Sequence, residues 1–292
     1  MTSKTTVVIV THNRATSLSR TLLELSKLRP IPPIVVVDNA STDDTANVVD
    51  AARSVIPALT TITRSRNEGA AARNYGVWAA STPYIAFCDD DSWWDRDALP
   101  LAEKVLDEHP AIALLAARTL VGPQARNDPL NDRMACSPLG TRPGAPGPSV
   151  LGFLACASVV RRSSFENVGG FSRVLEFVGE EALLALDLAA QGWELCYVED
   201  LVAYHHPSSV RANASRRRNR EIRNDTLTVV MRRPVSTVAS ALISLMFAAV
   251  RTPSAAPALF DTIRKLPAAV AHRRVVPTHL ERRLEELERS RP

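Results

Sequence analysis

Three consecutive aspartates stand in the segment "YIAFCDDDSWWD", Tyr84 to Asp95, between an apolar run and two tryptophans. Adjacent carboxylates repel one another unless water or a cation relieves the repulsion, and the apolar neighbours limit the access of water. Hard divalent cations bind carboxylate and phosphate oxygens together. The segment therefore indicates a site for a divalent cation and a phosphorylated ligand, although a solvated helix start capped by Asp91 or Ser92 would explain the same residues.

The direction of each carboxylate depends on the backbone that carries it. In an extended segment, alternation places Asp89 and Asp91 on one side and Asp90 on the other. We therefore predict that Asp91 is the direct metal ligand and that Asp89 contacts a ribose or a metal-bound water. Mn²⁺ or Mg²⁺ would reverse the repulsion between these carboxylates and a diphosphate.

The aspartates follow the last of four short apolar runs that alternate with helical patterns. We expect strands at 5–11, 33–39, 59–64 and 83–89, with helices at 15–28, 43–55 and 69–80. Apolar strands separated by helices favour an α/β fold with a mostly parallel sheet, whose ligands gather at the carboxyl ends of the strands. The motifs "THNR", "DNASTDD", "RSRNEGAAARN" and "DDD" follow these strands, so they are expected to converge on one site.

Individual residues in these motifs suit a nucleoside diphosphate. Asp38 ends a strand and could accept hydrogen bonds from a base or ribose. Gly69 permits close approach of the backbone, and the helix that it opens favours phosphate. Arg73, one turn further, could add a charged contact. Asp38 could equally cap a turn, and Arg73 could be a solvated helix residue.

The second half of the chain has a different composition. A helix at 97–109 and a strand at 112–118 precede a Gly/Pro-rich stretch, 121–149, which we expect to be a mobile loop over the site or partly disordered. A strand in "VLGFLACASVVRR", a helix from "GEEALLALDLAAQG" and a strand "ELCYVED" follow, and then the segment "LVAYHHPSS". The end of the chain holds "RRRNREIRN", an apolar helix at 234–250 and a charged helix "LERRLEELERS".

Bulk properties limit the class of protein. The 292 residues are 46% hydrophobic and 23% charged, as in an ordinary globular protein. The four cysteines are widely spaced, which favours reduced, buried thiols, and no secretory signal is visible, so we expect the protein in the cytoplasm. Lys and Arg number 18 against 24 Asp and Glu through His205, but 17 against 7 after it. This basic tail indicates an anionic ligand or partner.

Five blocks together resemble family 2 glycosyltransferases, which have the GT-A fold. "VVIVTHNR", "VVVDNASTDDT", "RNEGAAARNYG", "AFCDDDSWW" and "GEEALLALDLAAQGW" occur in the family's order and approximate spacing, and the resemblance covers residues 5–206. It implies metal-dependent, inverting transfer of a hexosyl group from a nucleoside-diphosphate sugar to an acceptor hydroxyl. The acceptor could be a small molecule, a glycan or a lipid-linked molecule, and no nucleic-acid partner is expected.

The resemblance also assigns residues by their match to the family's motifs. The positions expected to contact the nucleotide sugar are Thr11, Asn13, Arg14, Asp38, Asn67, Gly69, Arg73, Asp89 and Asp90. The positions expected to hold the metal are Asp91, Asp89 and a late histidine, His206 or His205, of which we prefer His206 because it precedes Pro207.

The general base is expected in the "GEE" motif, where the family usually has "ED". Its second acid, Glu181, is our candidate, and the departure leaves open whether Glu180 acts instead. An acceptor hydroxyl must lose its proton as the new bond forms, and a carboxylate opposite the leaving diphosphate can receive it. A helix N-terminus rich in acids is the structural alternative.

We expect a catalytic domain at 1–206, with a nucleotide-sugar-binding half at 1–118 and an acceptor half at 119–206, and a basic, mainly helical extension at 207–292. The apolar helix at 234–250 is short for a membrane span, but its basic flanks leave peripheral contact with the inner face of a membrane open. Two other functions remain open at this point. One is nucleotidyl transfer, and the other is a non-catalytic nucleotide-sugar binder or membrane adaptor.

Overall fold

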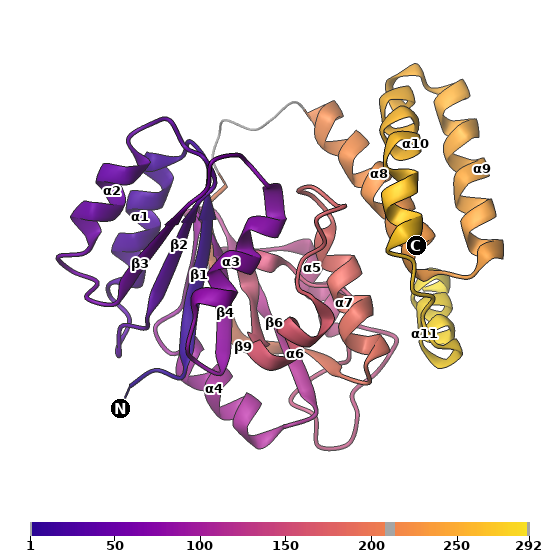
Figure 1. Cartoon of the computed structure of the whole chain (residues 1–292). Coiled ribbons are helices and arrows are strands. Elements are labelled where there is room, and N and C mark those ends of the chain that lie inside the picture. Colours follow the sequence, from indigo (N-terminus) through magenta and orange to yellow (C-terminus); the bar gives the residue numbers. More distant parts are fainter. Residues whose placement is uncertain (1, 208–213, 291–292) are drawn as a thin grey trace.

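The protein is built around one curled β-sheet with helices on both faces, and further helices follow at the C-terminal end (Figure 1). The computed structural model describes residues 2–207 and 214–290, so the end of the "LVAYHHPSS" segment, Ser208 and Ser209, lies outside the described residues. The strands are β1 Thr5–Thr11, β2 Ile34–Asp38, β3 Leu59–Thr63, β4 Tyr84–Asp89, β5 Ser92–Trp94, β6 Ile112–Val121, β7 Arg126–Asn127, β8 Ser158–Arg161 and β9 Glu194–His205. The helices are α1 Ala15–Leu25, α2 Thr45–Ala52, α3 Arg73–Ala79, α4 Ala98–Glu108, α5 Pro129–Ala135, α6 Arg162–Val168, α7 Glu180–Ala190, α8 Ala214–Arg232, α9 Val235–Arg251, α10 Ala256–Ala271 and α11 Thr278–Arg289.

The first half of the sheet is parallel, as the alternation of apolar strands and helices predicts. The strand order is β3-β2-β1-β4-β8-β6-β9-β5, and β7 pairs with β6. Strands β1 to β4 are parallel, β8 runs antiparallel to both β4 and β6, and β6 is parallel to β9. In this register Thr11 lies opposite Asp38, and Val10 lies opposite Asp89. The carboxyl ends of β1, β2 and β4 therefore meet at one edge of the sheet.

Two hydrophobic layers hold the sheet in place. Val7 and Ile9 of β1 pack with α1, α2 and α4 on one face, and Val8 packs with α3 and α7 on the other. On α1, Leu18, Leu22 and Leu25 repeat at helical spacing, so they lie on one buried face. Burial of each such side chain contributes about 1.5–3 kcal/mol, which fixes the strands whose ends carry the polar motifs.

Two expectations about the connections are wrong. The expectation that residues 121–149 are partly disordered is wrong, because they contain β7 and α5, and Asp128 caps α5 by accepting a hydrogen bond from the Leu130 amide. The strand expected in "VLGFLACASVVRR" is restricted to β8, because a short 3₁₀ helix, Ala155–Ala157, precedes it.

The cysteines are free thiols, as predicted, and three are buried, but Cys136 is exposed.

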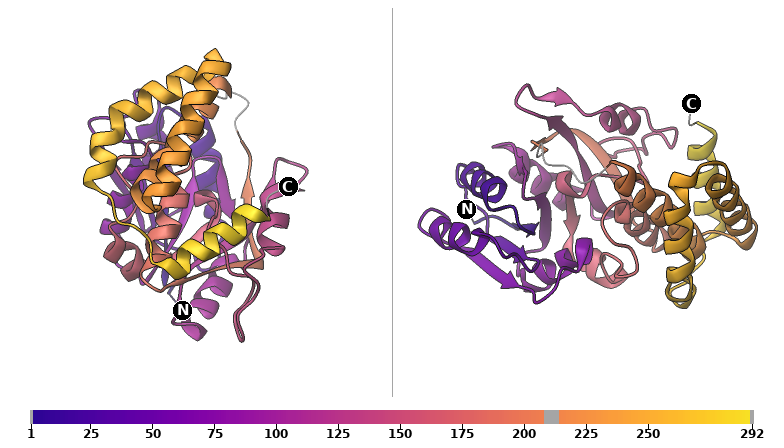
Figure 2. Two further views of the ribbon diagram at one scale, coloured as in Figure 1. Left: turned by 90° about the vertical axis from the view of Figure 1, so that its right-hand side faces the viewer. Right: turned by 90° about the horizontal axis from the view of Figure 1, so that it is seen from above.

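The C-terminal helices α8, α9 and α10 lie beside one another at the end of the molecule away from α1 and α2 (Figures 1 and 2). Leu227, Val230 and Met231 of α8 share a small core with Leu183 of α7 and Ala269 of α10. The arginine-rich segment 216–224 is part of α8. Among residues 2–207 and 214–290, no helix combines the length and the apolar character needed to cross a bilayer.

Candidate active site

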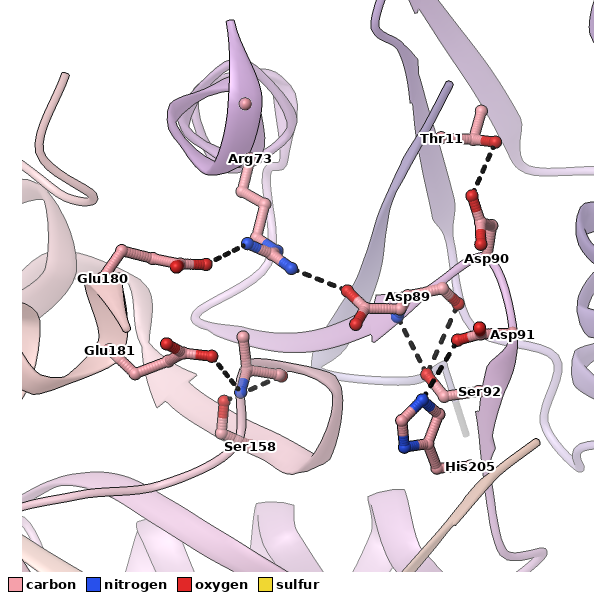
Figure 3. A network of polar contacts seen from close by, with 12 residues as sticks. Thr11, Arg73, Asp89, Asp90, Asp91, Ser92, Ser158, Glu180, Glu181 and His205 are labelled. Atoms are coloured by element: carbon pink, nitrogen blue, oxygen red, sulfur yellow. Dashed lines mark hydrogen bonds and ion pairs between the residues drawn. The ribbon is translucent and has the colours of Figure 1, made fainter. Parts of the chain in front are cut away.

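The three aspartates lie where β4 ends. The strand stops at Asp89, Asp90 and Asp91 form a turn, and β5 begins at Ser92, whose Oγ accepts a hydrogen bond from the Asp89 amide at 2.8 Å. The expected alternation is therefore wrong beyond Asp89, because the backbone is not extended there. Figure 3 shows the outcome, with Asp89 directed towards Arg73, Asp90 towards Thr11 and Asp91 towards His205.

Asp90 is the most enclosed of the three carboxylates. Its Oδ2 accepts a hydrogen bond from Thr11 Oγ1 at 3.0 Å, and its backbone carbonyl accepts one from Thr21 Oγ1 at 2.9 Å. Arg14 Nη1 lies 3.4 Å from Asp90 Oδ1 and 2.9 Å from Asp91 Oδ2. Burial raises the pKa of Asp90 to about 7, the Arg14 charge opposes this shift and the Asp91 charge adds to it. Thr11 and Arg14 thus contact the aspartates, as the convergence of the strand ends predicts.

His205, not the preferred His206, faces the aspartates. β5 pairs with the end of β9, so that Ser92 lies opposite His205, and His205 Nε2 is 3.3 Å from Asp91 Oδ1. Burial lowers the pKa of His205, but the hydrogen bond and charge of Asp91 outweigh it, and the pKa is raised. The next residue along the chain points elsewhere, because the His206 ring packs 4.5 Å from the Trp93 ring. Burial lowers the pKa of His206, as does the nearby Arg20.

Arg73 joins the aspartates to the "GEE" motif. Its Nη2 is 2.6 Å from Asp89 Oδ1, and its Nη1 is 2.9 Å from Glu180 Oε1 (Figure 3). The side chain is 3% exposed, so it is neither a solvated helix residue nor openly available to a diphosphate. Burial works against the charged form, but the Asp89 and Glu180 charges outweigh it and raise the pKa of Arg73. It is a buried cation shared by two carboxylates.

Glu181 is more accessible than its neighbour. Glu180 is fully buried on Arg73, whereas Glu181 is half-buried and its Oε1 lies 3.4 Å from the Ala155 amide. Burial raises the pKa of Glu181 above its usual value. Burial also raises the pKa of Glu180, to which the Glu181 charge adds and which Arg73 opposes. Of the two acids, Glu181 is the one without a strong counter-charge in direct contact, which suits a group that accepts a proton.

The remaining predicted residues form polar contacts in the segments that follow β1, β2 and β3. Asp38 Oδ1 accepts a hydrogen bond from the Ser41 amide at 2.9 Å, so it does cap a turn. Asn13 Oδ1 accepts one from the Thr42 amide at 2.7 Å. Asn67 Oδ1 accepts a hydrogen bond from the Gly69 amide at 2.9 Å. Gly69 has a φ of 59°, in the left-handed region that favours glycine.

Sequence reasoning missed Asn39, which organises the cluster of contacts around Asn67 and Gly69. Its side chain donates to Asn67 Oδ1 at 3.0 Å and to the Gly69 carbonyl at 3.2 Å, and it accepts from the Glu68 amide at 2.9 Å. The residue is 2% exposed. Its place directly after Asp38, in "VDNAS", is the only signal in the sequence that would have indicated it.

Three of the four tryptophans pack in the hydrophobic cores, whereas Trp78 is 51% exposed. Trp94 is 2% exposed and Trp93 is 8% exposed, and both belong to the core beneath α1 and α4. The partly buried Trp193 packs against the opposite core.

The donor atoms around Asp91 fit a divalent cation in their chemistry. Carboxylate oxygens from Asp90 and Asp91 and the imidazole of His205 are groups that Mn²⁺ accepts. Among the described residues, no three His, Cys, Asp or Glu side chains are arranged to hold a metal ion by themselves. Phosphate oxygens of a ligand would have to complete such a coordination shell.

The architecture and the position of this site define a fold of the GT-A glycosyltransferase type. The chain belongs to glycosyl transferase family 2, whose family model matches residues 6–169. The model of glycosyl transferase family 21 matches residues 151–290 and so extends over the C-terminal helices. The resemblance inferred from the five sequence blocks is therefore confirmed.

Similar proteins support this assignment. The chain is 32% identical over 217 residues to the pre-mycofactocin glycosyltransferase of Mycobacterium tuberculosis, an alignment that covers 70% of this chain and 43% of the relative. The chain thus matches less than half the length of that relative. A solved mannosyltransferase from Pyrobaculum calidifontis, in complex with GDP-Man and Mn²⁺, has a TM-score of 0.63 at 20% identity, over 93% of this chain and 87% of that one. Staphylococcus aureus TarS 1–349 in complex with UDP-GlcNAc has a TM-score of 0.63 at 18% identity, over 94% and 84%.

Proposed function

We propose that this protein is an inverting, metal-dependent glycosyltransferase that moves a sugar from a nucleoside-diphosphate sugar to an acceptor hydroxyl. The observation that supports it most is the chain of contacts from Asp89 through Arg73 to Glu180, because Asp91 follows two residues after Asp89 and Glu181 follows Glu180 directly. The proposed cation ligands and the proposed base would then lie on either side of this buried ion-pair network, at the carboxyl ends of the strands. Nucleotidyl transfer has no comparable support, since the family assignment is to glycosyl transfer.

The donor is proposed to lie along the ends of β1 and β2. Asp38 and the cluster that Asn39 organises border the place for the nucleoside, and the loop around Gly69 lies beside it. The Arg14 guanidinium is partly exposed next to Asp91, so it can contact an anionic oxygen of the diphosphate. Arg73 acts indirectly, because it holds Asp89 and Glu180 in position.

The proposed metal ligands are Asp91 and His205, with Asp89 and Asp90 close by. Mn²⁺ or Mg²⁺ bound there would offset the charge that develops on the leaving diphosphate. The fold neighbour from Pyrobaculum calidifontis, solved with Mn²⁺, supports a divalent cation without deciding between the two.

Glu181 is proposed to receive the acceptor proton. Attack of the acceptor oxygen on the anomeric carbon forms the new glycosidic bond as the bond to the diphosphate breaks, and the hydroxyl proton passes to the Glu181 carboxylate. Attack on the face opposite the leaving group inverts the anomeric centre. A pKa raised by burial makes this carboxylate a better proton acceptor than an exposed one.

A panel of UDP-, GDP- and TDP-sugars tests the proposal directly. We expect slow release of free sugar and nucleoside diphosphate from at least one donor in Mn²⁺ or Mg²⁺, and none with a chelator. Product NMR with a reactive acceptor then reports the anomeric configuration. Absence of hydrolysis and transfer with every donor, or release of pyrophosphate from a nucleoside triphosphate instead, would exclude the proposed reaction.

The division into a catalytic domain at 1–206 and an extension at 207–292 also stays a proposal. It is supported by the sheet, whose last strand ends at His205, and by the purely helical character of residues 214–290. A small-molecule, glycan or lipid-linked acceptor, a cytoplasmic location and contact with the inner face of a membrane are all compatible with this arrangement.

A further inference from the structure

Helix α9 presents an apolar surface that the rest of the described chain does not cover. Ile243, Met246, Phe247 and Val250 follow the spacing i, i+3, i+4 and i+7, so they lie on one face of the helix. All four are exposed, with 60% of Phe247 and 82% of Val250 accessible. The opposite face carries Leu245, which is 3% exposed. Both faces of this helix are therefore apolar, but only the face that carries Leu245 is buried.

The neighbouring helix α10 repeats the feature. Phe260, Ile263 and Val270 are spaced at i, i+3 and i+10, which places them on one face, and each is more than half exposed. Helix α9 lies at the edge of the molecule farthest from α1 and α2, beside α10 (Figures 1 and 2). Exposed apolar side chains gathered in this way mark an interaction surface rather than ordinary scatter.

The charges beside this surface are basic. No charged residue occurs between Val235 and Val250, and Arg251 ends α9. Arg264 on α10 is exposed as well. Asp261, the one acidic residue of α9 and α10, lies 3.9 Å from the buried Arg223. Over residues 214–276 the chain has 12 Lys and Arg against 3 Asp and Glu. Phe247 and Arg251, one turn apart, also line a shallow hollow, so an aromatic ring and a guanidinium meet at the surface.

We propose that the exposed faces of α9 and α10 form a docking surface for an anionic lipid bilayer. The apolar side chains enter the boundary between headgroups and acyl chains, and Arg251 and Arg264 contact the lipid phosphates. Helix α9 lies in the plane of the membrane, because 17 residues span about 25 Å, less than the hydrocarbon core. A second copy of the chain is the less favourable occupant, because a two-fold contact through this surface would bring arginines together.

This inference goes beyond the proposed transfer reaction and can fail independently of it. The test is flotation of the full chain with vesicles of phosphatidylcholine alone and with vesicles that also contain phosphatidylglycerol. We expect flotation with the anionic vesicles and a much smaller bound fraction with the neutral ones, with binding reduced by salt. A chain that stays unbound with both kinds of vesicle overturns the proposal, whatever its activity towards nucleotide sugars.

Substitutions locate the surface. Phe247→Glu and Phe260→Glu are each expected to reduce the vesicle partition coefficient by at least about tenfold, because each buries less apolar area and adds a negative charge. Leu23→Glu is the matched control, since Leu23 is 57% exposed on α1, and it should bind vesicles like the unmodified chain. Unchanged binding in both phenylalanine variants overturns the assignment of the surface.

Charge variants and oligomeric state complete the test. Arg251→Gln with Arg264→Gln should lower binding to anionic vesicles and leave the weak binding to neutral ones unchanged, whereas Lys104→Gln on α4 should have no effect. Light scattering gives the mass of each variant, and circular dichroism reports that the variants are folded. A dimer that Phe247→Glu converts to a monomer, in a chain that does not bind vesicles, would assign the surface to a second copy and overturn the lipid proposal.

Discussion

The Arg73 guanidinium and the Glu180 carboxylate form an ion pair, 2.9 Å from Nη1 to Oε1, in which both side chains are almost completely buried. The two residues are 107 positions apart in the chain, and they connect the first turn of α3 to the first turn of α7. Arg73 Nη2 also contacts Asp89. The ion pair therefore connects the aspartate segment to α7, the helix that carries Glu181. Loss of this ion pair would therefore affect both the aspartates and the helix that carries Glu181.

Arg73→Met should destabilise the protein by about 3–5 kcal/mol, because it leaves Glu180 buried without its counter-charge. Urea unfolding followed by circular dichroism measures this loss. Arg173→Met is the control, since Arg173 is exposed, and its loss should be within about 0.5 kcal/mol. The double variant Arg73→Met with Glu180→Met should be more stable than Arg73→Met alone; equal or lower stability would contradict an ion-pair origin of the effect.

Glu181→Gln should reduce the rate of transfer by about 10²-fold or more and leave donor affinity unchanged, because the amide cannot accept the acceptor proton. Steady-state kinetics with calorimetry of donor binding separates the two quantities. Glu166→Gln, at an exposed position of α6, is the matched control and should retain full activity. Loss of donor binding in Glu181→Gln would assign Glu181 to the donor and not to proton transfer.

The pH dependence of kcat/KM follows from the same residue. Burial raises the pKa of Glu181 above 4.5, and a base acts only when deprotonated. Activity should therefore be complete above the raised pKa and fall as the pH drops through it, with a midpoint above 4.5. In Glu181→Gln the residual activity should no longer show this fall at low pH. If the fall persists unchanged, a group other than Glu181 causes it.

Much of this site could be predicted from local sequence, and the reasons for the exceptions are physical. The apolar runs predict β1, β2, β3 and β4, and a parallel sheet places their carboxyl ends together, so Thr11 and Asp89 to Asp91 are found at one edge. The orientation of the aspartates could not be predicted, because β5 is only three residues long and depends on pairing with β9. The role of Arg73 as a buried bridge was missed for a related reason, since both of its partners come from other elements.

His205→Ala should weaken Mn²⁺ binding by about tenfold in the presence of the nucleoside diphosphate that the donor panel identifies, whereas His206→Ala should leave it unchanged. Only the first ring lies 3.3 Å from Asp91 Oδ1, and the second packs on Trp93. Free Mn²⁺ measured by electron paramagnetic resonance gives the two affinities without reference to turnover. The adjacent histidines thus control for each other, and equal effects of both variants would exclude a specific role for His205.

Asn224 on α8 supports the loop that leads into the "GEE" motif. The side chain is fully buried, and its Nδ2 donates to the Glu176 carbonyl at 2.6 Å and to the Val178 carbonyl at 2.7 Å. Gly179 follows with φ of 88°, and α7 then begins at Glu180. The C-terminal helices therefore contact the segment that positions Glu181, although they contribute no strand to the sheet.

Asn224→Ala should cost about 1–3 kcal/mol in the free energy of unfolding, because two backbone carbonyls lose their donor. It should also lower kcat, since the loop leads directly into the helix that carries the proposed base, Glu181. Asn219→Ala is the control on the same helix, because Asn219 donates one hydrogen bond to the Ser254 carbonyl at an exposed position. A destabilised Asn224→Ala protein with unaltered kcat would limit Asn224 to a structural role, whereas a reduced kcat in the folded variant makes α8 part of the machinery that positions Glu181.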